Sequence, residues 1–234
     1  CHNGHQLPSL FLVGAMKCGT TSLTQQLFDE WGYSRGVKFP DSLGWSDEKE
    51  HHFFELDSRF KKGLDYYATS FPPCGEHVMT IDATPNYFYE NAHKAAARIK
   101  ELYGPERMRR TTFAAILCDP VARAHSYYYH FQVNYGCCKD GKTFREYTRS
   151  AAHGAADKIN KREKVGGIWS IGLYGRDIDA WVEQVGDFTI IPAVTYFEHA
   201  DDTLRALVAA VKAKSGQVGG KEAASHAARA PTKN

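Results

Sequence analysis

The architecture of this chain follows from one stretch near its start, which reads Leu7-Pro-Ser-Leu-Phe-Leu-Val-Gly14-Ala-Met-Lys17-Cys-Gly19-Thr20-Thr21-Ser22-Leu23. The apolar run from Leu10 to Val13 is typical of a buried strand, and the hydroxyl-rich residues after Gly19 are typical of a helix start. Gly14 and Gly19 bracket four residues, so backbone N–H groups can approach an anion closely. Because a helix N-terminus leaves N–H groups unpaired, the stretch predicts a phosphate cradle.

The position of the lysine separates this loop from a triphosphate loop. A Walker A loop has Lys directly after its second glycine, whereas here Thr20 takes that position and Lys17 lies inside the loop. The pattern Gly-x-x-Lys-x-Gly-Thr-Thr resembles the 5′-phosphosulfate loop of sulfotransferases, which use 3′-phosphoadenosine 5′-phosphosulfate (PAPS). The resemblance implies that Lys17 is catalytic. The donor-binding residues that it implies are Lys17, Cys18, Gly19, Thr20, Thr21 and Ser22.

The composition indicates one α/β domain spanning residues 1–234. Its 234 residues, 43% of them hydrophobic, are enough for a sizeable core. A net charge of only +2 excludes wholesale nucleic-acid binding, and no apolar run is long enough for membrane contact by this segment. Residues 215–234 are rich in Gly, Ala and Lys, so we expect a flexible tail there.

The six cysteines leave the redox compartment open. Because no Cys-x-x-Cys pairs with a second one, a zinc site is not expected, and free or partly paired thiols are. The chain begins at Cys1 rather than at Met. A Golgi-lumen protein whose anchor has been removed and a cytoplasmic protein both fit this start.

Strand patterns alternate with helix patterns along the chain. The expected strands are 10–13, 78–81, 111–117 and 188–194, and the expected helices are 20–31, 61–70, 91–103, 120–134, 143–152, 172–185 and 201–214. This order predicts a P-loop-like, three-layer α/β domain with a central, mainly parallel sheet. Ligands bind such sheets at the carboxyl ends of the strands. The phosphate loop, Asp82 and Cys118 all follow expected strands, so we expect them to meet in one crevice.

A second motif carries an acid suited to proton transfer. The segment Lys49-Glu50-His51-His52-Phe53-Phe54-Glu55 resembles one found in the heparan-sulfate-type sulfotransferases. The resemblance implies that Glu50 is the catalytic base, that His52 and Glu55 assist it, and that Glu55 also binds the acceptor. A carboxylate within hydrogen-bond reach can take the proton of an attacking hydroxyl or amine.

A third motif, Cys118-Asp-Pro-Val-Ala-Arg123-Ala-His-Ser126, resembles the 3′-phosphate element of the same family. The resemblance implies that Ser126 binds the 3′-phosphate of PAPS. The family usually has Arg where this chain has Cys118, which removes a bidentate charged donor. Arg123 either compensates by contacting the phosphate or forms a salt bridge on the helix surface, and a residue from elsewhere is a further alternative.

The segment Asp82-Ala-Thr-Pro-Asn-Tyr87 resembles the family's acidic-x-Thr-Pro-x-Tyr element beside the acceptor. The resemblance implies that Asp82 and Tyr87 bind the acceptor. Heparan sulfate enzymes have Lys where this chain has Ala83, which argues against a close heparan sulfate specialist. A saccharide is the first candidate for the acceptor, and a small secondary metabolite is the second.

Together the motifs predict a PAPS-dependent sulfotransferase that moves a sulfuryl group to an acceptor hydroxyl or amine. No metal is expected, since neither a Walker Lys-Ser/Thr pair nor a metal-ligand cluster is present in the sequence. One alternative is a P-loop kinase, which requires Mg²⁺ and a Walker lysine. Another is an inactive nucleotide-binding module, which the residues Cys118 and Ala83 suggest.

Overall fold

The structure of the chain is a computed structural model. It describes residues 1–39, 48–75, 78–89, 91–135, 142–152, 168 and 170–216. Nearly all of the flexible tail expected at 215–234 lies outside the described residues.

The centre of the molecule is a five-stranded sheet in the order β2-β3-β1-β4-β5. Its strands are β1 (Leu10–Gly14), β2 (Tyr33–Ser34), β3 (Met79–Asp82), β4 (Thr112–Leu117) and β5 (Thr189–Pro192). All neighbouring strands pair in parallel. β1 lies in the middle, where Leu10 pairs with Ile81 on one side and Thr112 on the other. The loop after β1 is therefore flanked by the ends of β3 and β4.

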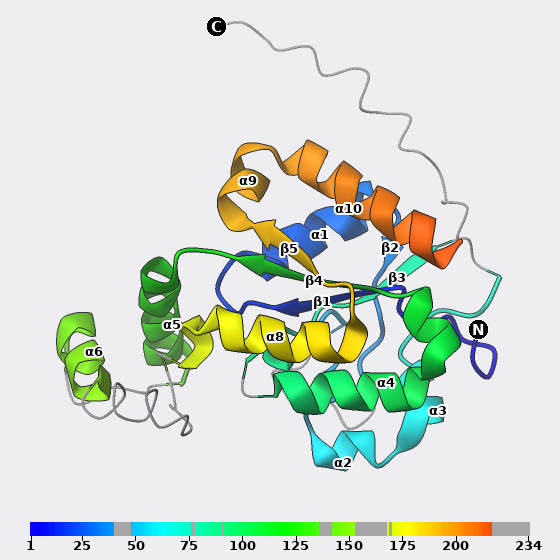
Figure 1. The fold of residues 1–234 in the computed structure, drawn as a ribbon, viewed down its shortest axis with the longest axis horizontal. Coiled ribbons are helices and arrows are strands. Elements are labelled where there is room, and N and C mark those ends of the chain that lie inside the picture. The colour runs from blue at the N-terminus through cyan, green and yellow to red at the C-terminus, as the bar shows by residue number, and fades with distance from the viewer. Residues whose placement is uncertain are drawn as a thin grey trace, which may run out of the picture.

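Helices cover both faces of this sheet (Figure 1). α1 (Thr20–Glu30) and α10 (Ala200–Ser215) lie on one face, and α4 (Ala92–Arg109) and α8 (Tyr174–Val185) lie on the other. The remaining helical elements are α2 (Asp57–Phe60), α3 (Gly63–Ala68), η1 (Pro85–Tyr87), α5 (Pro120–Tyr135), α6 (Phe144–Ala152), η2 (Ser170–Gly172) and α9 (Ala193–Glu198). The three-layer α/β fold predicted from the sequence is confirmed.

Several local features differ from the sequence prediction. The helix expected to end at Tyr103 does break there, since Gly104 has non-helical backbone angles, but a second helical stretch that was not expected follows this kink and completes α4 to Arg109. The strand expected over 188–194 ends at Pro192, which caps α9 and has no N–H for the sheet ladder. β2 was not predicted, because two residues carry no periodic signal.

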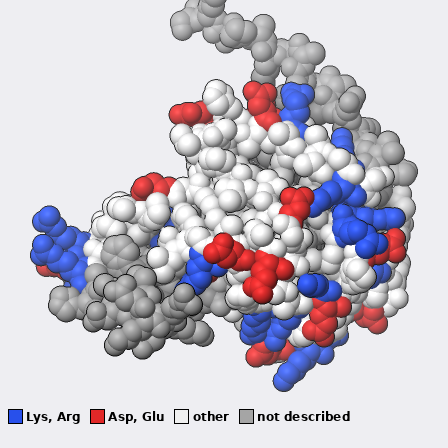
Figure 2. All heavy atoms as spheres, viewed as in Figure 1, with Lys and Arg blue, Asp and Glu red and all other residues white. Residues whose placement is uncertain are grey.

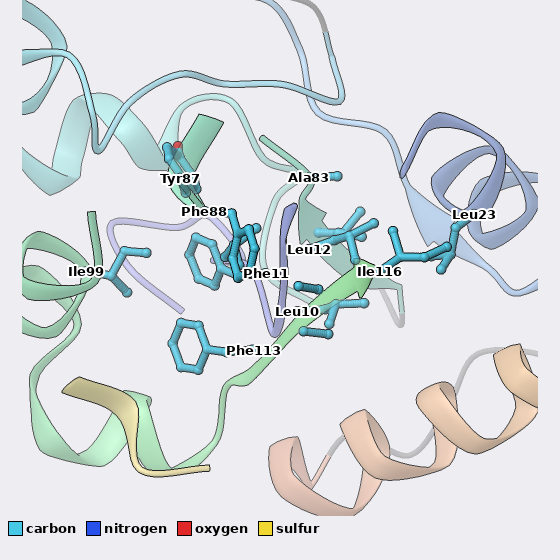
Figure 3. Packing of buried hydrophobic residues seen from close by; sticks show 14 of the residues in the cluster. Leu10, Phe11, Leu12, Leu23, Ala83, Tyr87, Phe88, Ile99, Phe113 and Ile116 are labelled. Atoms are coloured by element: carbon cyan, nitrogen blue, oxygen red, sulfur yellow. The ribbon is translucent and has the colours of Figure 1, made fainter. Parts of the chain in front are cut away.

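Side chains of β1 alternate between the two faces of the sheet (Figure 3). Phe11 stacks on Phe113 with ring centroids 5.4 Å apart, on the same side as Ile99 of α4. Leu10 and Leu12 lie on the opposite side, toward Leu23 of α1. Each buried side chain of this size stabilises the fold by about 1.5–3 kcal/mol. The core therefore fixes the strand that delivers the phosphate loop.

Two disulfides are present among the described residues. Cys1 is bonded to Cys74, and Cys18 to Cys118. Cys137 and Cys138 fall outside the described residues. The thiols are thus at least partly paired, as expected, but the sequence did not show which cysteines pair.

The face of the molecule shown in Figure 2 carries interspersed positive and negative side chains, and neither sign covers it. This mixture agrees with the net charge of +2. Within the described part of the chain, no helix combines the length and the apolar composition needed to cross a membrane.

Candidate active site

The phosphate loop connects the end of β1 to the first turn of α1. The Ala15 N–H donates to the Ile116 carbonyl at 2.8 Å, which ties the start of the loop to β4. Lys17 and Gly19 both have a positive φ, of 71° and 103°. A Cβ on Gly19 would lie 2.8 Å from the Phe197 ring. Glycine is therefore needed at position 19 for its backbone angles and for the space around it.

The N-terminus of α1 is open to an anion. No described side chain caps it by a hydrogen bond, and no acidic residue lies in its first turn. Thr21 and Ser22 are exposed there. The unpaired N–H groups and the positive end of the helix dipole suit a phosphate or sulfate group.

A cleft of about 580 Å³ opens beside this loop. The sequence-predicted site residues that line it are Lys17, Gly19, Thr20, Thr21, Glu50, His52 and Ser126. They come from three segments far apart in the sequence. The structure thus brings the three motifs together in one crevice.

Glu50 lies between two cationic groups. Its carboxylate forms ion pairs with the Lys49 ammonium and with His52 Nε2, the latter at 3.5 Å. Lys49 Nζ also donates to Thr21 Oγ1 at 3.2 Å. Lys49 therefore links the carboxylate to the first turn of α1. Lys49 stands in the motif around Glu50, but the motif did not assign it a role in the site.

His52 is held between two carboxylates, since its Nδ1 is hydrogen-bonded to Glu55 Oε1 and its Nε2 faces Glu50. Burial alone lowers the pKa of His52, but the hydrogen bonds to Glu50 and Glu55 outweigh burial and raise the pKa to about 9. Burial raises the pKa of Glu50, yet His52 and Lys49 bring it below its ordinary value. At neutral pH the site therefore holds an imidazolium beside an ionised carboxylate.

Two further titratable groups of the cleft, Lys17 and His130, have lowered pKa values. Burial lowers the pKa of Lys17, with Glu50 acting in the opposite direction. His130 of α5 lines the cleft as well, and burial together with the charge of Lys17 lowers its pKa. His130 was missed by the sequence analysis, because a histidine within an aromatic helix carries no spacing signal.

The start of α5 carries the third motif. Asp119 caps the helix by accepting the N–H groups of Val121 and Ala122 at 3.0 and 2.7 Å. Ser126 lines the cleft. Arg123 is buried and donates to the Ile168 carbonyl at 2.5 Å. It is therefore not on the helix surface, which corrects the alternative of a surface salt bridge.

Arg123 keeps unused hydrogen-bonding capacity. Its Nε and Nη1 atoms have no hydrogen-bond partner among the described residues. Burial lowers the pKa of Arg123, while the nearby Tyr174, Tyr127 and Tyr89 act to raise it. A buried guanidinium with free donors next to Ser126 is a natural partner for a phosphate.

No family model matches the chain. The chain is 25% identical over 183 residues to heparan sulfate glucosamine 3-O-sulfotransferase 5 of Mus musculus and of Homo sapiens. The match covers 76% of this chain and 45% of each relative, so the chain spans less than half the length of these proteins. The crystal structure of a sulfotransferase from Alicyclobacillus acidocaldarius superposes with a TM-score of 0.62 at 21% identity, over 88% of this chain and 81% of that one.

The chain resembles the sulfotransferases of the heparan sulfate type. The resemblance that the motifs indicated is thus confirmed, and the solved sulfotransferase shares its fold.

Three residues expected to bind the acceptor of such a sulfotransferase do not line the cleft. The side chains of Asp82 and Tyr87 are 0% exposed, and Glu55 is buried behind His52. Asp82 accepts hydrogen bonds from the hydroxyls of Tyr67 at 2.8 Å and Tyr87 at 3.0 Å. The expectation of direct contact is corrected here, because Asp82 ends a buried strand and its carboxylate is used up within the core.

The neighbours of Asp82 and Tyr87 do reach the cleft. Pro85 and Asn86, which lie between them in the sequence, form part of its wall. In the part of the chain that the structure describes, no three His, Cys, Asp or Glu side chains gather as a metal site requires.

Proposed function

We propose that the chain is a sulfotransferase that moves a sulfuryl group from PAPS to a hydroxyl or amine of an acceptor. The observation that carries the proposal is the meeting of two motifs in one cleft. Lys17 and the open N-terminus of α1 form one wall, and the Glu50 carboxylate faces them. Similarity to named sulfotransferases supports the reaction class.

The cleft suits a donor with two separated phosphates. The loop N–H groups and Thr21 provide one anionic subsite. Ser126 lines the cleft and provides a second subsite at the start of α5. Arg123 lies three residues before it and does not line the cleft, but its buried Nε and Nη1 atoms have no hydrogen-bond partner among the described residues. A nucleotide with phosphates at both the 3′ and the 5′ position matches this arrangement, and we propose that Arg123 supplies the charge that Cys118 does not.

The residues divide the chemistry between them. Glu50 accepts the proton of the acceptor as it attacks sulfur. Lys17 neutralises the charge that develops on the departing phosphate oxygen. Positioning and charge carry most of the catalysis in such a loose transition state. Lys49 and His52 hold the Glu50 carboxylate in its ionised form and fix its place. We propose no metal in this reaction.

For the acceptor we propose a saccharide. The Glu50 segment resembles that of polysaccharide sulfotransferases, and the relatives are named for heparan sulfate glucosamine. A small secondary metabolite is the second candidate, favoured by the aromatic residues Tyr89 and Phe131 in the cleft and by Ala83. Asp82, Tyr87 and Glu55 support the cleft from behind.

Calorimetry with the nucleotide product, 3′-phosphoadenosine 5′-phosphate, tests the proposal. We expect tight binding that needs no Mg²⁺. Preference for ATP with Mg²⁺ would instead support a kinase. Incubation with radiolabelled PAPS and a panel of saccharide and small hydroxyl acceptors then separates an enzyme from an inactive nucleotide-binding module, since only the enzyme labels an acceptor.

A further inference from the structure

The disulfide between Cys18 and Cys118 lies within the proposed donor site. Cys18 stands between Lys17 and Gly19, and its side chain is 2% exposed. Cys118 is the first residue after β4. The bond joins two segments 100 residues apart, with Cα atoms at 5.3 Å. It therefore fastens the middle of the phosphate loop to the neighbouring strand end.

The backbone around Cys18 needs such a fastening. The residue before it, Lys17, has a φ of 71°, a conformation that costs free energy for any residue with a Cβ. Such a conformation persists only where its surroundings hold it. The direction of the Lys17 side chain into the cleft depends on this backbone.

Few described contacts hold the loop besides the disulfide. The Ala15 N–H donates to the Ile116 carbonyl, and the Cys18 N–H donates to the Ala15 carbonyl at 3.1 Å. The second of these contacts is internal to the loop. The Cys118 N–H approaches the Cys18 sulfur at 3.1 Å, and the Tyr174 hydroxyl lies 3.5 Å from the same atom. The Cys118 sulfur also lies 3.9 Å from the Lys17 carbonyl oxygen. These contacts between the loop beyond Ala15 and its surroundings therefore all involve one of the two disulfide sulfurs.

We propose that the Cys18–Cys118 disulfide is a positioning element that holds Lys17 in its donor-binding conformation, so that the activity of the site depends on this bond being oxidised. The inference rests on the proposed function. It extends that function, because it makes the state of two sulfurs a determinant of donor binding.

Reduction of the bond is a balanced two-electron exchange with an added dithiol. One thiolate of the dithiol attacks a disulfide sulfur and releases the other cysteine as a thiolate. The second thiol then closes the oxidised dithiol, and both cysteines take up protons. Cys118 is partly exposed whereas Cys18 is buried, so the attack is expected at Cys118.

The test compares the wild-type protein, oxidised or reduced by dithiothreitol under native conditions, with the double variant Cys18→Ser/Cys118→Ser. The matched control is Cys1→Ser/Cys74→Ser, which removes the other disulfide. The measurements are the affinity for 3′-phosphoadenosine 5′-phosphate, kcat, the KM values for PAPS and acceptor, and amide hydrogen exchange of residues 14–23.

We expect the Cys18→Ser/Cys118→Ser variant to bind the nucleotide about tenfold more weakly, as when one loop in ten keeps the competent conformation. Its KM for PAPS rises and its kcat falls, while the KM for the acceptor is unchanged. Reduced wild type behaves in the same way, and the reductant has no further effect on the variant. The Cys1→Ser/Cys74→Ser control matches oxidised wild type and keeps the response to reductant.

Unchanged nucleotide affinity and unchanged exchange of residues 14–23 after loss of the bond would overturn the proposal. If the variant does not fold, reduction of the folded wild type gives the same comparison. Hydrogen exchange can be measured without nucleotide, so it tests the positioning role of the disulfide separately from the proposed function. Faster exchange of residues 14–23 in a protein that binds no nucleotide would refute the proposed function but support the positioning role of the disulfide. Unchanged exchange would refute only that positioning role.

Discussion

Residues 49–55 and residues 82–87 lie side by side, and both contain an acid that the motifs place at the active site. The first segment turns Glu50 into the cleft, where its side chain is 23% exposed. The second keeps Asp82 fully buried. A substrate can therefore reach Glu50, whereas Asp82 contacts only other groups of the protein.

Asp82, the buried acid, holds in place the segment that carries Glu50. Thr84 Oγ1 donates to Asp82 and accepts the His52 N–H at 3.2 Å. The Tyr87 hydroxyl likewise donates to Asp82 and accepts the Phe53 N–H at 3.1 Å. The carboxylate of Asp82 therefore orients two hydroxyls, which fix the backbone beside Glu50. Burial of such a network is favourable only when its polar groups are satisfied.

The largest expected effect belongs to Lys17, which shares the cleft with Glu50. Lys17→Ala should abolish sulfuryl transfer and weaken nucleotide binding, because the charge on the departing phosphate is no longer neutralised. Transfer of label from PAPS and calorimetry measure the two effects. Lys100→Ala, on an exposed position of α4, is the control. Full activity in Lys17→Ala would refute the assignment of the loop.

Glu50→Gln should lower kcat by about 10²–10⁴-fold, the usual contribution of a general base, and leave nucleotide affinity near that of wild type. The matched control is Glu48→Gln, since Glu48 is exposed two residues away. Steady-state kinetics with saturating PAPS give the comparison. A wild-type rate in Glu50→Gln would mean that another group accepts the proton.

The pH dependence of the free energy of unfolding should reflect the titration of His52, whose backbone N–H links the two segments through Thr84. Its pKa is raised from 6.5 to about 9, so its contribution is complete below pH 6.5 and is lost as the pH rises through 9. The loss amounts to about 3 kcal/mol. Urea unfolding at pH 6.5 and above pH 9 measures it. The same fall in a His52→Gln variant would assign it to other groups.

The smallest effect on activity is expected from a change around Asp82 in residues 82–87. This change should affect the free energy of unfolding rather than kcat. Tyr67→Phe removes one hydrogen bond to Asp82 and should lower the free energy of unfolding by about 1–3 kcal/mol, with kcat little changed. Tyr66→Phe, at the neighbouring position of α3, is the control. A large loss of kcat at unchanged stability would show that Asp82 acts in the cleft after all.

The sequence was sufficient for the fold and for the meeting of the three motifs. Each motif follows a buried strand or lies next to one, and parallel strands end at the same edge of a sheet. The burial of Asp82 was not predictable, because a motif shows which residues occur together but not which side of a strand end each one faces. The disulfide was missed because its cysteines are 100 residues apart.

The sheet order has a consequence for folding during synthesis on the ribosome. β1 pairs with β3, which follows it early, but also with β4, which is made much later. The N–H of Ala15 has no carbonyl partner from β4 until residue 116 has been synthesised. The disulfide of Cys18 cannot form until Cys118 has been added two residues later. A nascent chain that has been made only as far as residue 110 already contains Lys17 and Glu50, yet it lacks both of these anchors of the phosphate loop. Vectorial synthesis therefore completes the donor site only after Lys17 and Glu50 have been made.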